Sequence, residues 1–420
     1  MERKANWYEL DNAAKIVPST AKGANTRVFR LTCELREEVN KEILQSALDD
    51  TIEEFPFFNC VLHRGIFWYY LEDSYIKPLV EEEHTPACLP IYFPGKKNLL
   101  YRVNFYKKRI NLEMFHVLAD GTGAFMFFKS LIIRYLQLRH NLSDNIKPVD
   151  DFSLEEKNVD AFTDNYSKQK GLKQLNEMKS VRAYQVSGEV DDNLLPHLLE
   201  GTVSAGKFLE LAHRYDSTVG VLCVALYIKA VILGMNRTQK KRPIVVSVPV
   251  NLRQFYKSGT ARNFFGVINI VYDPKDYTGE LKSITEPVAK DFKEKLSPEN
   301  VEKTMNSYSA LEHNLAIKMV PLFIKDFTIG HFDRAAKRGV TTSMSNLGQL
   351  KMPPEVEGYI DRFGAFMTAS SQQVCVCTFK DKMVFGEVSP FKTHKIMLNF
   401  FRCLTEEGIE VELGTNDYDE

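Results

Sequence analysis

The chain has 420 residues, a length that exceeds one simple hydrophobic core and favours two lobes. Hydrophobic residues make up 44% of the chain and charged residues 26%, as in ordinary soluble globular proteins. The formal net charge is -1 and neither end carries an acidic or basic tail, which argues against nucleic acid as a partner.

The first part of the chain alternates predicted strands and helices. Apolar and polar residues alternate at 27–35, which predicts a half-buried strand. An apolar stripe predicts a helix at 38–54, and Pro56 ends that element. Strands joined by short turns are then expected, and an amphipathic helix follows them. These elements are predicted at 57–62, 66–72, 98–106, 110–118 (strands) and 122–139 (helix).

The composition turns polar between Asn141 and about Ser180, as in a linker or crossover between lobes. We therefore divide the chain into an N-terminal lobe at 1–145, a linker at 146–180 and a C-terminal lobe at 181–420. Strands and helices are mixed in both lobes, which predicts an α/β (α+β) fold with mixed sheets.

The second lobe is predicted to combine strands with long helices. The proline-bracketed apolar run at 243–250 is typical of a buried strand. The other strands are expected at 181–186, 266–272, 340–345, 363–369, 373–379, 383–388 and 409–413. Helices are expected at 203–214, 217–235, 282–318 (with breaks) and 392–406.

Targeting and redox signals point to a cytoplasmic protein without a transmembrane segment. The N-terminus lacks the apolar region of a secretory signal. The longest apolar stretch, at 219–235, is broken by Lys229, so it is expected to be a buried core helix. Seven scattered cysteines do not suggest a disulfide framework, and Cys375 and Cys377 alternate on one strand face as buried thiols do.

His116 is the candidate catalytic residue. It is the one ionisable member of the apolar face of the predicted strand 110–118, and it precedes the turn at Asp120-Gly121. An apolar setting lowers the pKa of an imidazole and keeps it neutral near pH 7, as a general base requires. The alternative is a core histidine that donates to a backbone carbonyl, followed by an ordinary Asp-Gly turn.

The pattern His116-x-x-x-Asp120-Gly121 resembles the HxxxDG motif of the chloramphenicol acetyltransferase-like superfamily, which includes condensation domains and alcohol acetyltransferases. Many members have two adjacent histidines, whereas the first position here is Phe115, which makes a condensation domain less favoured. Further segments resemble family motifs in the same order. They are Phe55-Pro56-Phe57-Phe58, Val248-Pro249-Val250-Asn251-Leu252-Arg253, Asn263-Phe264-Phe265-Gly266 and Ser345-Asn346-Leu347-Gly348.

The resemblance implies two lobes with a tunnel between them and His116 midway along it. It implies an acyltransferase that binds no permanent cofactor and takes acyl-CoA, or acyl-phosphopantetheine on an acyl carrier protein, as co-substrate. The acceptor would be a small alcohol or amine. His116 would act as general base, whereas Asp120 would be structural and pair with Arg253 of the other lobe. Gly121 would permit a turn or a close approach.

An oxyanion donor is harder to assign from the sequence. The resemblance brings Ser345 and Asn346 near the tunnel, although Ser345-Asn346-Leu347-Gly348 also reads as a simple turn. Asn263 is a further candidate, with a structural role as its alternative.

Other functions fit the sequence less well. Gly121-Thr122-Gly123 has no third glycine and no P-loop lysine, which excludes a nucleotide-binding loop. The nine histidines show no metal-ligand spacing, and no Gly-x-Ser-x-Gly elbow is present. Two alternatives stay open: a carrier-dependent, condensation-like amide or ester synthase, and a catalytically silent binding module.

The predicted strand 383–388 leads through a turn into helix 392–406 and echoes the arrangement around His116. His394 is expected inside that helix, so this second copy lacks a matching histidine. One active site per chain, at His116, is therefore expected.

Overall fold

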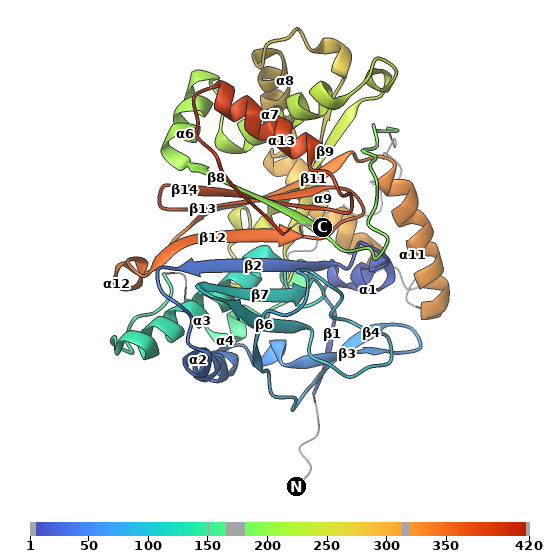
Figure 1. The fold of residues 1–420 in the computed structure, drawn as a ribbon. Helices are drawn as coiled ribbons and strands as arrows, with labels where there is room; N and C mark the ends of the chain where they lie inside the picture. Colours follow the sequence, from blue (N-terminus) through green and yellow to red (C-terminus); the bar gives the residue numbers. More distant parts are fainter. Residues whose placement is uncertain (1–5, 150, 165–180, 313–318, 417–420) are drawn as a thin grey trace.

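The computed structural model describes residues 6–149, 151–164, 181–312 and 319–416 (Figure 1). A five-stranded sheet forms the centre of the N-terminal lobe. Its order is β12 (Ile360–Met367), β2 (Val28–Leu35), β7 (Arg109–Phe115), β6 (Tyr101–Tyr106) and β5 (Val80–Glu82). All its pairs are antiparallel except β5 with β6. A smaller antiparallel sheet lies beside it, in the order β1 (Trp7–Glu9), β4 (Tyr69–Asp73) and β3 (Cys60–Arg64).

A seven-stranded mixed sheet forms the centre of the C-terminal lobe. Its order is β10 (Phe265–Tyr272), β9 (Ile244–Asn251), β11 (Thr342–Leu350), β13 (Gln373–Phe379), β14 (Lys382–Ser389), β8 (His197–Ser204) and β15 (Glu412–Thr415). Strand β11 runs parallel to both of its neighbours, and the other pairs are antiparallel. Both lobes therefore contain a mixed sheet, as the predicted fold class requires.

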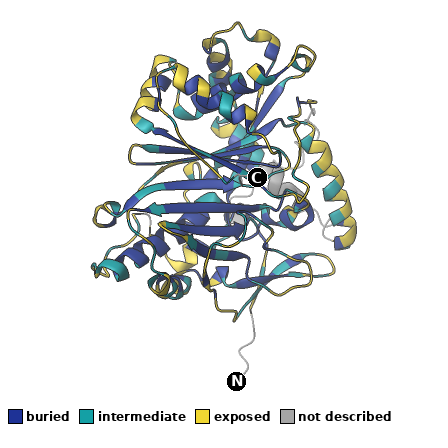
Figure 2. Cartoon of the chain, in the orientation of Figure 1, coloured by how far each residue is buried: buried dark blue, intermediate teal, exposed yellow. Residues whose placement is uncertain are grey.

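Helices cover the outer faces of the two large sheets (Figure 1). The N-terminal sheet is covered by α2 (Lys41–Glu54) and α3 (Gly121–His140), and the C-terminal sheet by α6 (Ala205–Arg214), α7 (Val219–Gly234), α8 (Lys282–Lys295) and α13 (Lys395–Glu406). The remaining helices are α1 (Val17–Thr20), α4 (Leu154–Asn158), α5 (Ala161–Asp164), α9 (Pro298–Glu312), α11 (Leu322–Lys337) and α12 (Pro354–Glu357). The strands between the helical layers are mostly buried (Figure 2).

Local capping sets where the two N-terminal helices begin. The Asn40 side chain accepts a hydrogen bond from the backbone of Ile43, so α2 starts at Lys41. The side chain of Asp120 accepts one from Gly123, so α3 starts at Gly121. Helix α3 ends at His140, and the next residue, Asn141, caps it with a left-handed backbone (φ 51°).

Strand β12 connects the lobes. It lies in the segment 181–420, yet its backbone pairs with β2 of the N-terminal sheet. Its Ala365 carbonyl also lies against Gly386 of β14, where a Cβ atom would approach it to 2.2 Å. The division at 145 and 180 stays a prediction, with β12 as the part of the second segment that belongs to the first sheet. Residues 165–180 of the predicted linker lie outside the described residues.

Several local predictions are wrong. Residues 181–186 do not form a strand, because the backbone amides of Ala183 and Tyr184 bond to Arg338 and Pro243 outside any ladder. Strand β8 and helix α11 were not predicted. Helix α11 leaves four large apolar side chains exposed, which hides the usual one-sided pattern. These are Phe323, Ile324, Phe327 and Phe332.

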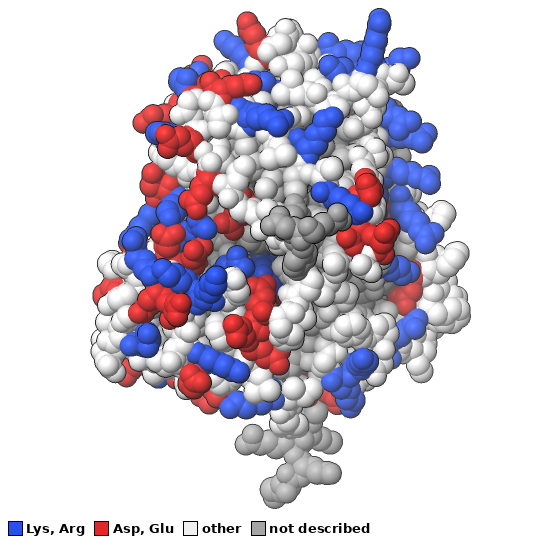
Figure 3. Space-filling model, viewed as in Figure 1, with Lys and Arg blue, Asp and Glu red and all other residues white. Residues whose placement is uncertain are grey.

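The seven cysteines all lie in described residues, are all buried and form no disulfide. Burial raises the pKa of the Cys375 thiol to about 12, which keeps it in the neutral form. Acidic and basic side chains are interspersed over the face shown in Figure 3, in keeping with the small net charge. In the described part of the chain, no helix on its own is long and apolar enough to span a membrane, although α6 and α7 would pass such a test as a pair bent by 82°.

Candidate active site

His116 lies one residue beyond β7, in the turn that leads to α3. It was predicted within the strand, but the ladder between β2 and β7 ends at Phe115. The amide of His116 donates to the Arg27 carbonyl (3.0 Å), and Leu118 then donates to the Phe115 carbonyl to close the turn. Phe115 stacks on Tyr92 in the core, with ring centroids 5.4 Å apart. The turn thus frees the imidazole from the strand face and directs it between the lobes.

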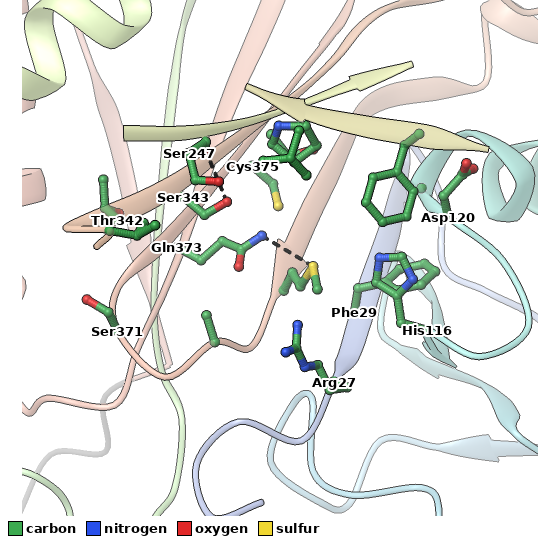
Figure 4. Close-up of a pocket in the computed structure, with 18 of the residues that line it drawn as sticks. Arg27, Phe29, His116, Asp120, Ser247, Thr342, Ser343, Ser371, Gln373 and Cys375 are labelled. Atoms are coloured by element: carbon green, nitrogen blue, oxygen red, sulfur yellow. Dashed lines mark hydrogen bonds between the residues drawn. The ribbon is translucent and has the colours of Figure 1, made fainter. Parts of the chain in front are cut away.

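The His116 imidazole lines a cavity of about 410 Å³ that both lobes enclose (Figure 4). Two aromatic rings flank it: Phe29 edge-on at 5.4 Å and Phe265 at 5.6 Å between centroids. Burial lowers the pKa of His116 below its usual 6.5. The imidazole is therefore neutral at physiological pH.

A buried amide holds one nitrogen of this imidazole. His116 Nδ1 lies 3.0 Å from Asn263 Oδ1, while Asn263 Nδ2 donates to Asp11 Oδ2 at 3.0 Å. Since the Nδ2 group faces the carboxylate, the amide oxygen must face the histidine. Nδ1 then carries the proton, and Nε2 has a lone pair available as a base.

Asp11 is a site residue that the sequence did not reveal. It is buried, and it accepts a hydrogen bond from Ala14 through Oδ1 while Arg262 Nε lies 3.9 Å from Oδ2. Burial raises the pKa of Asp11 to about 6. No local pattern marks this residue, since its contact with Asn263 spans 252 positions of sequence.

The contacts of Asn263 favour its structural role over that of an oxyanion donor. Its carbonyl oxygen faces His116 and its amide donates to Asp11, so both ends of the side chain are in use. The structural alternative fits instead, because Asn263 connects a buried carboxylate to the imidazole.

Asp120 points away from the imidazole (Figure 4) and joins the two lobes. Its Oδ2 accepts from Arg253 Nη1 and from the Phe264 amide, both at 2.8 Å. Its Oδ1 accepts from the Gly123 amide at 2.8 Å. The contact between Asp120 and Arg253 that the resemblance implied is therefore present.

The Arg253 guanidinium is fixed by backbone carbonyls as well as by Asp120. Nε donates to the Thr260 carbonyl at 3.0 Å, and Nη2 donates to the Arg262 carbonyl at 2.6 Å. These bonds orient a side chain that is only 7% exposed. The pair is thus a buried and fully bonded connection between α3 and the second lobe.

Gly121 and Gly123 both allow close packing at the start of α3. A Cβ on Gly121 would lie 2.7 Å from a methyl of Leu347, which is the predicted close approach. A Cβ on Gly123 would lie 1.9 Å from the Ala261 carbonyl oxygen, which belongs to rigid backbone. A side chain is therefore less tolerable at position 123 than at position 121, although no sequence pattern marked Gly123.

Ser345 and Asn346 both line the cavity, on β11 and not on a simple turn. The pairing of β11 with β13 shifts register between Asn346 and Gln349, and Gly348 adopts a positive φ of 74°. Asn346 is exposed, and its Oδ1 accepts from the Gly348 amide. Of the two, Ser345 is the better placed to offer a donor.

A second cavity of about 660 Å³ meets the first one. Both are lined by Thr122, Asn251 and Leu347. The second cavity is also lined by Arg253, which pairs with Asp120, and by three lysines, Lys129, Lys257 and Lys351. Within the described ranges, no three His, Cys, Asp or Glu residues gather as metal ligands would.

No protein-family model and no curated protein matches this sequence. Solved structures do match, over nearly the whole chain. F. graminearum TRI101, solved with ethyl coenzyme A, has a TM-score of 0.65 and 11% identity, over 97% of this chain and 99% of that one. TRI3 trichothecene 15-O-acetyltransferase from Fusarium sporotrichioides has a TM-score of 0.60 and 10% identity, over 95% and 94%.

The first condensation domain of the CDA synthetase is similar as well, with a TM-score of 0.61 and 13% identity, over 96% of each chain. Identities this low show the fold alone. The chain has the two-lobed fold shared by acetyltransferases and condensation domains, which confirms the predicted fold class.

Proposed function

We propose that this chain, which has the fold of acetyltransferases and condensation domains, transfers an acyl group from a thioester to a small alcohol or amine. One observation carries the proposal: the His116 imidazole, held through Nδ1 by Asn263, lines a cavity between the lobes, an arrangement in which Nε2 is the basic nitrogen. Acyl transfer to a hydroxyl or amine needs a base of this kind.

In the proposed reaction, His116 Nε2 takes the proton from the acceptor as its oxygen or nitrogen attacks the thioester carbonyl. The carbon–sulfur bond of the tetrahedral intermediate then breaks, and the imidazolium returns the proton to the departing thiolate. The proton is conserved, and no bond forms between the acyl group and the enzyme. A base so positioned contributes about 10²–10⁴-fold in rate.

The bond between Asp120 and Arg253 supports this role indirectly. It ties the first turn of α3 to the second lobe, and His116 lies four residues before Asp120. The orientation of the imidazole therefore depends on the contact between the lobes. We assign Asp120 and Arg253 to positioning, with no part in proton transfer.

The second cavity is the better site for the donor. Coenzyme A carries several phosphate charges, and Lys129, Lys257 and Lys351 would complement them. Acyl-CoA or an acyl group on a carrier's phosphopantetheine would place its thioester near the residues shared by the two cavities. The acceptor would then occupy the cavity of about 410 Å³ that His116 lines.

Ser345 is the proposed donor to the developing oxyanion. It lines the same cavity as His116 and comes from the opposite lobe. A hydroxyl that donates to the tetrahedral oxygen would stabilise charge that the substrate lacks.

The test is release of free thiol from acetyl-CoA and longer acyl-CoAs in the presence of alcohols and amines. We expect acceptor-dependent release, with the acylated acceptor identified by mass spectrometry. The matching condensation domain supports a second candidate, in which the donor is an acyl group on a carrier protein. Turnover with a carrier-loaded donor but not with acyl-CoA would favour that candidate. No turnover with either donor would contradict the proposal and favour a silent binding module.

A further inference from the structure

Arg27 places a cation in the cavity beside His116. It immediately precedes β2, and its side chain points into the cavity (Figure 4). Its backbone has a φ of 56°, a left-handed conformation that non-glycine residues rarely adopt. Its carbonyl accepts the His116 amide at 3.0 Å, so the backbones of the two residues are held side by side.

The protein satisfies the Arg27 guanidinium only in part. Nη2 donates to Asp333 Oδ1 across 3.4 Å, which is long for a charge-assisted hydrogen bond. Nε is buried and finds no acceptor within the described part of the chain. A buried donor of a charged group without an acceptor is costly, unless a ligand supplies one.

Asp333 does not balance the charge at this end of the cavity. Its other carboxylate oxygen bonds to Lys337, and all three side chains line the cavity. Two cations thus share one carboxylate. The Asp120 carboxylate, which also borders the cavity, pairs with Arg253.

Gln373 offers a second poorly used donor in the same space. Its Nε2 donates to the Met367 sulfur at 3.2 Å, and a thioether is a weak acceptor. Figure 4 shows this amide and the Arg27 guanidinium directed toward the same part of the cavity. An anionic oxygen group placed there could accept from both side chains.

We propose that the acceptor substrate carries a carboxylate that Arg27 binds, with Gln373 as a second donor. The inference rests on the proposed function and names its acceptor class: a small hydroxy acid or amino acid. Its carboxylate would lie at Arg27 and its hydroxyl or amine at His116 Nε2. A planar guanidinium matches a carboxylate with two parallel hydrogen bonds.

The test is binding of hydroxy and amino acids, each paired with its methyl ester. The probes are 3-hydroxybutanoate, 4-hydroxyphenylacetate, glycine and phenylalanine, measured by calorimetry. We expect at least one acid to bind about tenfold more tightly than its ester, because only the acid carries a carboxylate. Arg27→Gln should remove that difference and leave ester binding unchanged.

Two further variants provide controls. Asp333→Asn removes the competing carboxylate and should tighten acid binding, the opposite sign to Arg27→Gln. Arg334→Gln removes an exposed charge on the same helix, outside the cavity lining, and should change nothing. Equal binding of every acid and its ester would overturn the inference, as would an Arg27→Gln variant that weakens only coenzyme A.

Measurements of binding and of turnover distinguish a failure of this inference from a failure of the proposed function. Charge-dependent binding of an acid without thiol release would support a carboxylate site at Arg27 and contradict the proposed function. Thiol release with neutral acceptors alone, unchanged in Arg27→Gln, would support the function and overturn the inference.

Discussion

Each lobe contains a histidine near a strand-to-helix turn, but the two histidines have different surroundings. His116 follows β7, bonds to a neutral amide and lines a cavity. His394 follows β14 and precedes α13, and its Nδ1 lies 2.6 Å from the Glu387 carboxylate. Both members of this second pair are buried, and neither lines a cavity described above.

The comparison shows why His116, and not His394, is the proposed catalytic residue. At His394 the partner is a buried carboxylate and none of the cavities described here is lined by the ring, so we propose that this pair serves the stability of the fold. A neutral amide partner fixes the ring without adding charge, and the cavity gives the second nitrogen something to act on. The prediction that His394 lies inside the helix is wrong, because it stands just before the first helical residue, Lys395.

The largest expected effect is a loss of activity on substitution of His116. His116→Ala should lower kcat about 10²–10⁴-fold, since it removes the proposed base. Its loss of stability should be near 1 kcal/mol, the value of one hydrogen bond. Thiol release and thermal unfolding by circular dichroism check this. Full activity in a folded His116→Ala protein would sink the assignment.

Breaking the connection between the lobes should reduce activity and stability together. Asp120→Asn leaves the buried Arg253 without its charge partner, so we expect a loss of about 3 kcal/mol in the free energy of unfolding. Denaturant titration measures it, and kcat reports the displaced imidazole. An Asp120→Asn protein as stable as the parent would show that the pair does not hold the lobes.

The second histidine should affect stability alone. His394→Ala removes the contact between the imidazole and the buried Glu387 carboxylate, at a cost of about 2 kcal/mol. Activity per folded molecule should be unchanged, as active-site titration can determine. A specific loss of kcat in this variant would mean that the two lobes do not differ as described.

Loss of the hydrogen bond between Asp11 and Asn263 should have a smaller effect, on kcat and not on KM. Asp11→Ala removes the acceptor that orients the amide, so kcat should fall about 10-fold with KM nearly constant. Asp11→Asn keeps an acceptor oxygen and should retain most activity. An equal loss in both variants would point to the charge of Asp11 rather than to its hydrogen bond.

The pH dependence gives the smallest effect. Burial lowers the pKa of His116 below 6.5, so kcat/KM should stay level near neutral pH and fall tenfold per unit only below that lowered pKa. Between pH 6.5 and that lowered pKa, the unfolded chain binds a proton at His116 that the folded chain does not, so the fold loses stability as pH falls through this range. The contribution of Asp11 changes with pH in the opposite direction. Because burial raises its pKa to about 6, its ionisation in the fold lowers stability as pH rises toward that value. An acid limb centred above 6.5 would contradict the assignment of His116.

The sequence identified the fold class and most elements near the site because their patterns are local. Alternation predicted β2 and β7, and an apolar stripe predicted α2 and α3. The motif at His116 and Asp120 carried the family resemblance, and with it Arg253. The sequence did not place Asp11, Gly123 or Arg27, since each matters only through residues far away in the chain.

The sequence by itself thus determined which residue types stand next to one another: a histidine before a turn, an aspartate at a helix start and an arginine after a buried strand. Only the tertiary structure decided what each side chain contacts. Asn263 changed from a candidate donor into a support for His116, because folding brings Asp11 against its amide. The physical reason is that hydrogen bonds and burial, which set tautomer and charge, depend on neighbours in space and not on neighbours in sequence.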